Sequence, residues 1–102
     1  MMLLGLALAL ASVPQDDPWL RLRPQVARAP QAVARFIERR AGCNHFLGEE
    51  PYDAARAEEL SKVIKELRCA RVERDERTLR QKYRGNRKIL RLLTDTEALI
   101  GW

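Results

Sequence analysis

Histidine and cysteine are scarce in this chain of 102 residues, which contains one histidine, His45, and two cysteines, Cys43 and Cys69. It has neither an HExxH pattern nor a CxxC pair, so the common histidine and cysteine motifs of metal sites are missing. We therefore predict no catalytic residue, no metal ligand and no cofactor, and we favour a non-enzymatic protein.

Strand-like alternation of apolar and polar residues is also absent, as are internal repeats. Apolar residues instead recur three and four positions apart, as they do on one face of a helix. Hydrophobic residues make up 46% of the chain and charged residues 32%, which is typical of a single globular domain at this length. The sequence predicts an all-α fold, a small bundle of about four short helices.

No apolar run is long enough to span a bilayer as a helix, which takes about 20 residues. The longest, residues 1–11, carries no charge and ends in Ala9-Leu10-Ala11. An apolar run that ends in small residues is typical of a secretory signal peptide, although the usual positive charge before it is missing. We predict export to the periplasm or beyond the cell, with no transmembrane segment in the mature chain. The alternative is a buried N-terminal helix, which so small a domain would cover poorly.

The mature chain is predicted to have an extended lead-in, residues 12–30, and a helical domain, residues 31–102. Four prolines indicate the lead-in, with one helical turn at most, after the third of them: Pro14, Pro18, Pro24 and Pro30. Three apolar side chains are expected to hold it against the domain: Trp19, Leu20 and Leu22.

Helices are predicted over residues 31–41, 54–69, 76–84 and 87–93. Gly42 is expected to end the first helix, in the left-handed conformation that glycine adopts easily. Residues 44–52 are predicted to form a loop. Three side chains are suited to be the N-caps of the later helices: Asp53, Asp75 and Asn86.

Two cysteines in a small exported domain are most simply explained by one disulfide, Cys43–Cys69. Cys43 follows the first predicted helix, whereas Cys69 ends the second, which is about 24 Å long. Because a disulfide needs Cα atoms within about 7 Å of each other, the loop between the helices must run along the second helix. We predict three anchors for this loop: Phe46, Leu47 and Tyr52.

Imidazole and carboxylate groups gather in that loop, which gives a candidate functional loop of six residues: Asn44, His45, Glu49, Glu50, Tyr52 and Asp53. Such groups can bind a divalent metal or transfer protons. The alternative function is therefore a small metal-dependent or acid–base enzyme centred on His45 with Glu49 and Glu50. The competing explanation is that the carboxylates are solvated or bind backbone amides at the next helix start. A disulfide-bonded Cys43 would not be a thiol nucleophile.

The net charge of +5 and a pI near 9.8 favour an anionic partner. Residues 77–93 contain no acidic residue, and six of their cations form a candidate anion-binding surface: Arg80, Lys82, Arg84, Arg87, Lys88 and Arg91. The competing explanation is an ordinary solvated face of two short helices. Only Tyr83 is aromatic in this stretch, which disfavours nucleic acid as the partner because bases need aromatic side chains to stack on.

Residues 36–53 read Phe-Ile-Glu-Arg-Arg-Ala-Gly-Cys-Asn-His-Phe-Leu-Gly-Glu-Glu-Pro-Tyr-Asp. This resembles the Gly-Cys-Asn-His-aromatic-x-Gly-Glu-Glu-Pro-Tyr-Asp signature of small exported bacterial proteins of uncharacterised function. That group has a second cysteine after the next helix and then a Tyr-x-Gly-Asn segment, matched here by Cys69 and Tyr83-Arg84-Gly85-Asn86. The resemblance covers residues 36–93 and implies export and a helical fold, without an activity. We expect a binding protein of the cell envelope, such as an inhibitor or envelope factor, that recognises an anionic surface or another protein.

Overall fold

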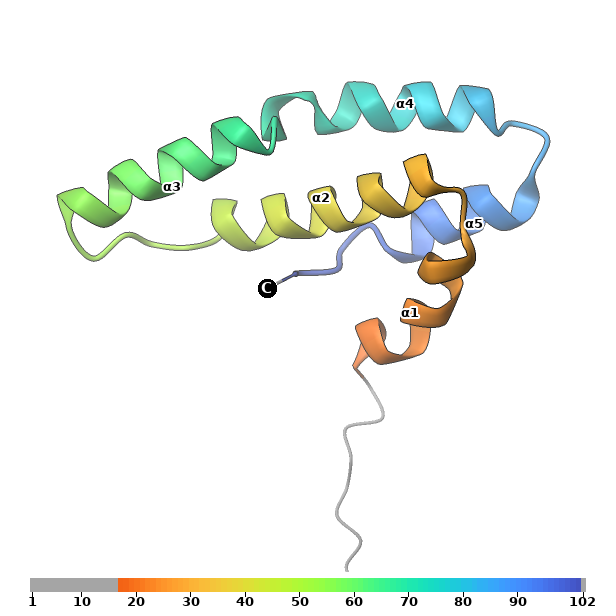
Figure 1. Ribbon diagram of the computed structural model, residues 1–102, viewed down its shortest axis with the longest axis horizontal. Coiled ribbons are helices and arrows are strands. Elements are labelled where there is room, and N and C mark those ends of the chain that lie inside the picture. The colour runs from red at the N-terminus through yellow and green to blue at the C-terminus, as the bar shows by residue number, and fades with distance from the viewer. Residues whose placement is uncertain (1–16, 102) are drawn as a thin grey trace, which may run out of the picture.

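The computed structural model describes residues 17–101, and this part of the chain is all-helical (Figure 1). The elements are α1 (Pro18–Arg28), α2 (Gln31–Leu47), α3 (Ala54–Glu66), the 3-10 turn η1 (Cys69–Arg71), α4 (Val72–Lys82) and α5 (Arg87–Asp95). The predicted all-α fold with one disulfide is confirmed, with five α-helices in the described part rather than about four. The predicted signal peptide lies outside the described residues.

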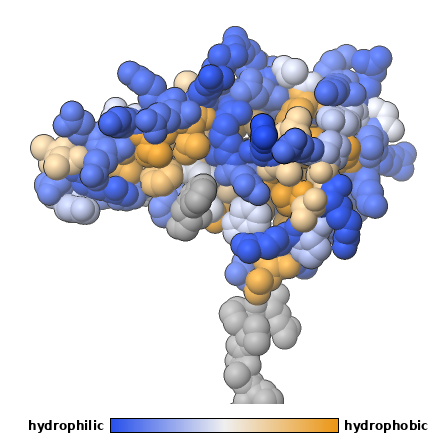
Figure 2. All heavy atoms as spheres, viewed as in Figure 1, coloured by the Kyte–Doolittle hydropathy of each residue, from blue (hydrophilic) through white to orange (hydrophobic). Residues whose placement is uncertain are grey.

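The long helix α2 is central, and α3 and α4 follow one another along one side of it (Figure 1). The core lies where α1, α2 and α5 meet, and it is made by aliphatic side chains and one aromatic: Leu22, Val26, Val33, Phe36, Ile37, Ala41, Ile89, Leu92, Leu93 and Leu99. Helix α3 contributes only Leu60 as a fully buried residue. Val63 and Ile64 are half-buried, and Figure 2 shows hydrophobic surface along the α3 side of the molecule. The bundle therefore has a well-packed body and a thinner arm made by α3.

The lead-in folds as helix α1, so the prediction of extended chain was wrong for residues 18–28. Asp17 caps the helix by accepting a hydrogen bond from the backbone N–H of Trp19 (2.9 Å), and Pro18 occupies the first turn, where its missing N–H costs nothing. Pro24 inside the helix costs about 3 kcal/mol. Burial of Leu22 and Val26 offsets this cost, since each buried aliphatic side chain contributes roughly 1.5–3 kcal/mol.

The three predicted anchors of the lead-in have different fates. Leu22 is buried, and Trp19 is half-buried. The indole N–H of Trp19 donates a hydrogen bond to the backbone oxygen of Ile100 (3.0 Å), so α1 is tied to the C-terminal segment. Leu20 is 58% exposed and anchors nothing.

Gly42 does not end α2, which continues to Leu47 and is followed by Gly48. Gly42 is instead buried beneath the C-terminal segment. There the N–H of Gly101 donates to the backbone oxygen of Ala41 (3.0 Å), and a Cβ on Gly101 would meet the Ala41 Cβ at 3.2 Å. The small residues allow this close approach of two backbones. The loop accordingly covers residues 48–53, not 44–52.

The Cys43–Cys69 disulfide is present, with a Cα–Cα distance of 5.6 Å. From Cys43, the last turn of α2 and residues 48–53 can reach roughly 26 Å at most, which is enough to span α3, a helix about 20 Å long. The loop leads beneath α3 to its first residue (Figure 1). Two of the three predicted anchors were wrong, because Leu47 is 61% exposed and Tyr52 79% exposed. Phe46 is half-buried, but it belongs to α2 and not to the loop.

Two of the predicted N-caps are confirmed and one is not. Asp53 accepts a hydrogen bond from the N–H of Arg56 (2.8 Å) at the start of α3, and Asn86 caps α5 through the N–H of Ile89 (3.1 Å). Helix α4 begins at Val72, before the predicted start at residue 76. Asp75 therefore lies in the first turn of α4, where carboxylates are favoured by the helix dipole.

Arg68 makes the turn that brings Cys69 to Cys43. Its φ of 55° and ψ of 49° are left-handed, a conformation that costs a residue with a Cβ about 1–2 kcal/mol. Arg39 of α2 stabilises this turn: its Nε donates to the backbone oxygen of Leu67 (2.7 Å) and a terminal nitrogen donates to that of Arg68 (3.4 Å).

Arg68→Gly is expected to raise the free energy of unfolding by about 0.5–1 kcal/mol. Glycine adopts the left-handed conformation without steric cost, and part of this gain is lost because glycine also gives the unfolded chain more freedom. Urea denaturation would measure the difference. Arg68→Ala is the matched control, since it removes the same side chain but keeps the Cβ. A glycine variant no more stable than the alanine variant would show that the turn is unstrained.

Candidate functional site

Asn44 of the candidate functional loop binds the C-terminal segment. Its side-chain amide donates hydrogen bonds to the backbone oxygens of Glu97 (3.1 Å) and Leu99 (2.8 Å). Its position one residue after the buried Cys43 on α2 places it beside that segment. Asn44 therefore has a structural role, because it joins α2 to the C-terminal segment.

Glu49 holds the loop to α3. Its two carboxylate oxygens accept hydrogen bonds from Arg56 at 2.7 and 2.8 Å, a bidentate pair of the strongest kind. The hydrogen bond from Arg56 lowers the pKa of Glu49 below its usual value, so this carboxylate is a poor proton donor at neutral pH. Asp53 is likewise engaged, as the N-cap of α3.

The remaining three loop residues do not assemble around a common point. His45 is half-buried, with its ring edge-on to that of Phe46 at 4.8 Å between centroids. Glu50 and Tyr52 are exposed. Within residues 17–101, no three histidine, cysteine or acidic side chains lie together as metal ligands. The loop is therefore built mainly to hold α2, α3 and the C-terminal segment in place.

A buried ion pair that the sequence reasoning missed lies across α2 and α4. Arg40 is only 3% exposed; one terminal nitrogen contacts Glu76 (2.9 Å), and the other donates to the Leu93 oxygen (2.7 Å) and the Thr96 hydroxyl (2.9 Å). Burial lowers the pKa of Arg40, and the carboxylate of Glu76 acts in the opposite direction. The sequence spacing could have indicated that Arg40 is buried, because Arg40 follows Phe36 and Ile37 by four and three positions on the apolar face of α2.

Arg80, one of the six candidate anion-binding residues, is engaged inside the protein. Its Nε contacts the second carboxylate oxygen of Glu76 (2.9 Å), and its terminal nitrogens donate to the backbone oxygen of Leu90 (3.4 Å) and the hydroxyl of Thr94 (3.0 Å). Arg80 thus joins α4 to α5 and does not belong to the free surface.

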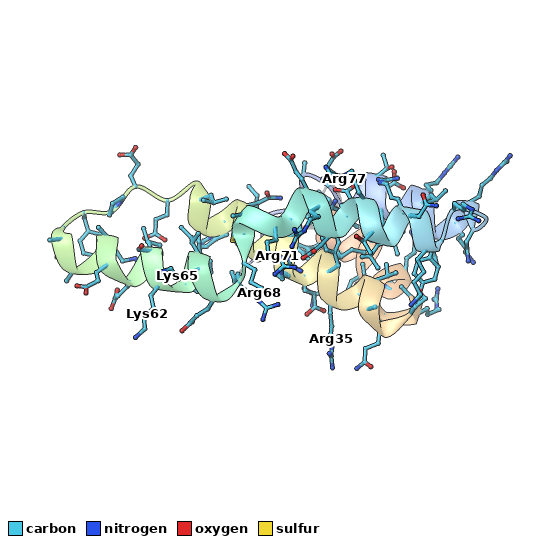
Figure 3. The ribbon with its side chains drawn as sticks, turned by 90° about the horizontal axis from the view of Figure 1, so that it is seen from above. Arg35, Lys62, Lys65, Arg68, Arg71 and Arg77 are labelled. Carbon is cyan, nitrogen blue, oxygen red and sulfur yellow. A yellow bond between two sulfur atoms is a disulfide. The ribbon has the colours of Figure 1, made fainter. Side chains whose placement is uncertain are left out.

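The other five candidate residues are exposed and have no ion-pair partner among the described residues. They lie at the turn from α4 to α5, and we call them the corner cations: Lys82, Arg84, Arg87, Lys88 and Arg91. Nitrogen-tipped side chains project outward from this end of the molecule (Figure 3). Because residues 77–94 contain no carboxylate, the positive charge of the corner is not offset within this segment.

A second group of exposed cations runs along α2, α3, η1 and α4, and we call them the edge cations: Arg35, Lys62, Lys65, Arg68, Arg71 and Arg77. Arg35, Lys62 and Arg68 point to the same side (Figure 3). Exposed acidic residues alternate with them along α2 and α3, among them Glu38, Glu58 and Glu66. The edge therefore carries mixed charge, which also explains why no basic run appears there in the sequence.

Two grooves border helix α1. The larger, about 520 Å³, lies between α1, α2 and Gly101 and contains one cation, Arg23, and one anion, Glu38. The smaller, about 260 Å³, separates the end of α1 from the start of α5 and has two charged residues in its lining, both basic: Arg28 and Lys88. The smaller groove opens beside the corner cations, because Lys88 belongs to both.

No protein-family model, curated protein or solved structure matches this chain. The resemblance of residues 36–53 to an exported bacterial group therefore stays a prediction. In the described part of the chain, none of the helices is both long and apolar enough to cross a membrane.

Proposed function

We propose that this protein is an exported, non-enzymatic binding protein of the cell envelope that recognises an anionic surface through its α4–α5 corner. The observation that carries the proposal is the set of corner cations, five exposed positive charges in a segment without a carboxylate. Each Lys or Arg near an anionic surface contributes about 1 kcal/mol to binding. Five together supply a useful affinity, whereas the mixed charges of the edge largely cancel beyond a Debye length of about 10 Å.

The disulfide supports export. Structural disulfides persist in oxidising compartments and are rare in the reducing cytosol, and Cys43–Cys69 staples a domain of modest size. Export also places the corner cations where anionic envelope components are exposed.

The alternative, a small metal-dependent or acid–base enzyme centred on His45 with Glu49 and Glu50, has less support. It needs both carboxylates beside the imidazole, but Glu49 is paired with Arg56, and no three histidine, cysteine or acidic side chains of residues 17–101 lie together. A binding function through the corner does not require the side chains of the candidate functional loop to be free, so their structural roles are compatible with it.

Charge reversal at the corner is expected to weaken binding to an anionic surface about a hundredfold at low salt, since three contacts contribute about 1 kcal/mol each. The test compares Arg84→Glu/Arg87→Glu/Arg91→Glu with the matched edge variant Arg35→Glu/Lys62→Glu/Lys65→Glu, which has the same net charge. The probes are phosphatidylglycerol vesicles, by co-sedimentation, and immobilised heparin. Equal losses for both variants, or no binding to either probe, would refute recognition through the corner.

A further inference from the structure

We infer that the groove between α1 and α5 seats the headgroup of an anionic phospholipid, so that the anionic surface recognised by the corner is a membrane surface. This inference rests on the proposed function and makes it more specific. Arg28 lies in the last turn of α1 and Lys88 in the first turn of α5. Both residues line the groove, so a phosphate entering it meets positive charge from two helices.

Four of the eight residues that line the groove are apolar, and Gln25 and Asn86 add uncharged polar groups. Ala29 and Pro30 line it from the α1–α2 link, and Ile89 and Leu92 from α5. The two α5 residues are only 8% and 5% exposed and belong to the core. A bare inorganic anion gains nothing from these apolar residues, whereas an amphiphile gains binding free energy from each methylene that it buries against them.

The size of the groove limits how much of a lipid it can hold. Its volume of about 260 Å³ lies just below the range of roughly 300–1,000 Å³ that is usual for sites enclosing a whole small molecule. The groove is therefore suited to a phosphate and the first carbons attached to it. The acyl chains remain in the bilayer, which makes this a surface contact rather than lipid extraction.

The surroundings of the groove favour a surface of many headgroups over a single soluble anion. One soluble anion would contact Arg28 and Lys88 alone. A membrane surface also offers phosphates to the exposed corner cations next to the groove, such as Arg87 and Arg91. The larger groove of α1 lacks this match, because Arg23 and Glu38 give it one charge of each sign.

Vesicle binding tests the groove apart from the general charge of the corner. Lys88→Glu is compared with Lys82→Glu, a corner cation that is not in the groove lining; both change the charge equally. Ala29→Met fills the groove without changing charge, and its fold is checked by circular dichroism. For phosphatidylglycerol vesicles we expect Lys88→Glu to bind at least fivefold more weakly than Lys82→Glu. We expect Ala29→Met to lose at least threefold in vesicle affinity with heparin retention unchanged.

NMR of the Ile89 and Leu92 methyl groups identifies the ligand. Dihexanoyl phosphatidylglycerol below its micelle concentration is expected to shift these signals, and inorganic phosphate at the same concentration to leave them in place. Equal shifts with phosphate would assign the groove to a free anion and overturn the lipid inference. If Lys88→Glu matches Lys82→Glu and Ala29→Met matches the wild type, the groove is not used, while the corner-against-edge comparison still decides the proposed function.

Discussion

Replacing both cysteines, as Cys43→Ala/Cys69→Ala, is expected to lower the free energy of unfolding by about 3.5 kcal/mol. The two residues are 26 positions apart, and closing a loop of this length removes that much conformational freedom from the unfolded chain. Alanine avoids placing a hydroxyl group at the buried position of Cys43, which is 2% exposed. For a domain whose total stability is roughly 5–15 kcal/mol, this is a large share.

The loss should be felt first in the α3 arm. Helix α3 buries only Leu60, whereas α5, a shorter helix, buries Ile89, Leu92 and Leu93. Apart from the disulfide, the arm is held by the bonds of Arg39 to the turn after α3 and by the Glu49–Arg56 pair of the loop. Without the covalent link, these contacts must hold α3 against α2.

Urea denaturation measures the total effect, and amide hydrogen exchange locates it. In the variant, exchange at α3 amides is expected to accelerate more than exchange at the core face of α2 and α5. A stability loss below about 1 kcal/mol, or equal acceleration in all helices, would show that noncovalent packing is enough to hold the arm.

Local signals in the sequence were sufficient for much of the fold. The spacing of apolar residues predicted four of the helices, and Asp53 and Asn86 were correctly identified as N-caps because capping depends on a few neighbouring residues. The disulfide could be predicted because the chain offers only one pairing. The geometry of the disulfide then required the loop to follow α3. It did not indicate which side chains hold the loop there.

The errors share a cause, which is that contacts distant in sequence overrode local preference. Gly42 is a typical helix end, yet α2 continues because the C-terminal segment packs on Ala41 and Gly42. Pro24 predicted irregular chain, yet α1 forms because Leu22 and Val26 reach the core. Neither contact partner is visible from the neighbouring residues.

The candidate sites were predictable to different degrees. The corner cations are consecutive enough in sequence to be recognised as a basic stretch, and five of the six predicted residues are exposed. The bonds of Arg80 to α5 could not be foreseen, because they depend on how α4 and α5 pack. The α1–α5 groove could not be predicted from the sequence for the same reason, since Arg28 and Lys88 are 60 positions apart.

Glu76→Gln is expected to lower the free energy of unfolding by about 3 kcal/mol. It leaves the guanidinium of Arg40 buried without a carboxylate, and removing one partner of a buried pair costs roughly 3–5 kcal/mol. We expect a loss at the lower end of this range because the side chain of Glu76 is 17% exposed and Arg40 retains its hydrogen bonds to Leu93 and Thr96.

The chain supplies a matched control one residue away. Asp75→Asn breaks the ion pair with Arg39 (2.7 Å), whose side chains are 24% and 29% exposed, so the loss should stay below about 1 kcal/mol. The two variants remove the same charge from adjacent positions of α4. They differ in the burial of the arginine left behind, and Glu76→Gln also loses the more exposed pair with Arg80. Urea denaturation at neutral pH compares them directly.

A double variant separates the cost of the orphaned charge from the value of the pair. Arg40→Met/Glu76→Gln removes the buried cation together with its partner, and replacing a buried pair with apolar side chains is often neutral. We expect the double variant to be at least as stable as Glu76→Gln alone, although it also loses the bonds to Leu93 and Thr96. If the double variant is instead clearly less stable, then Arg40 stabilises the core through those two bonds. The ion pair would in that case be secondary to the contact between α2 and the end of α5.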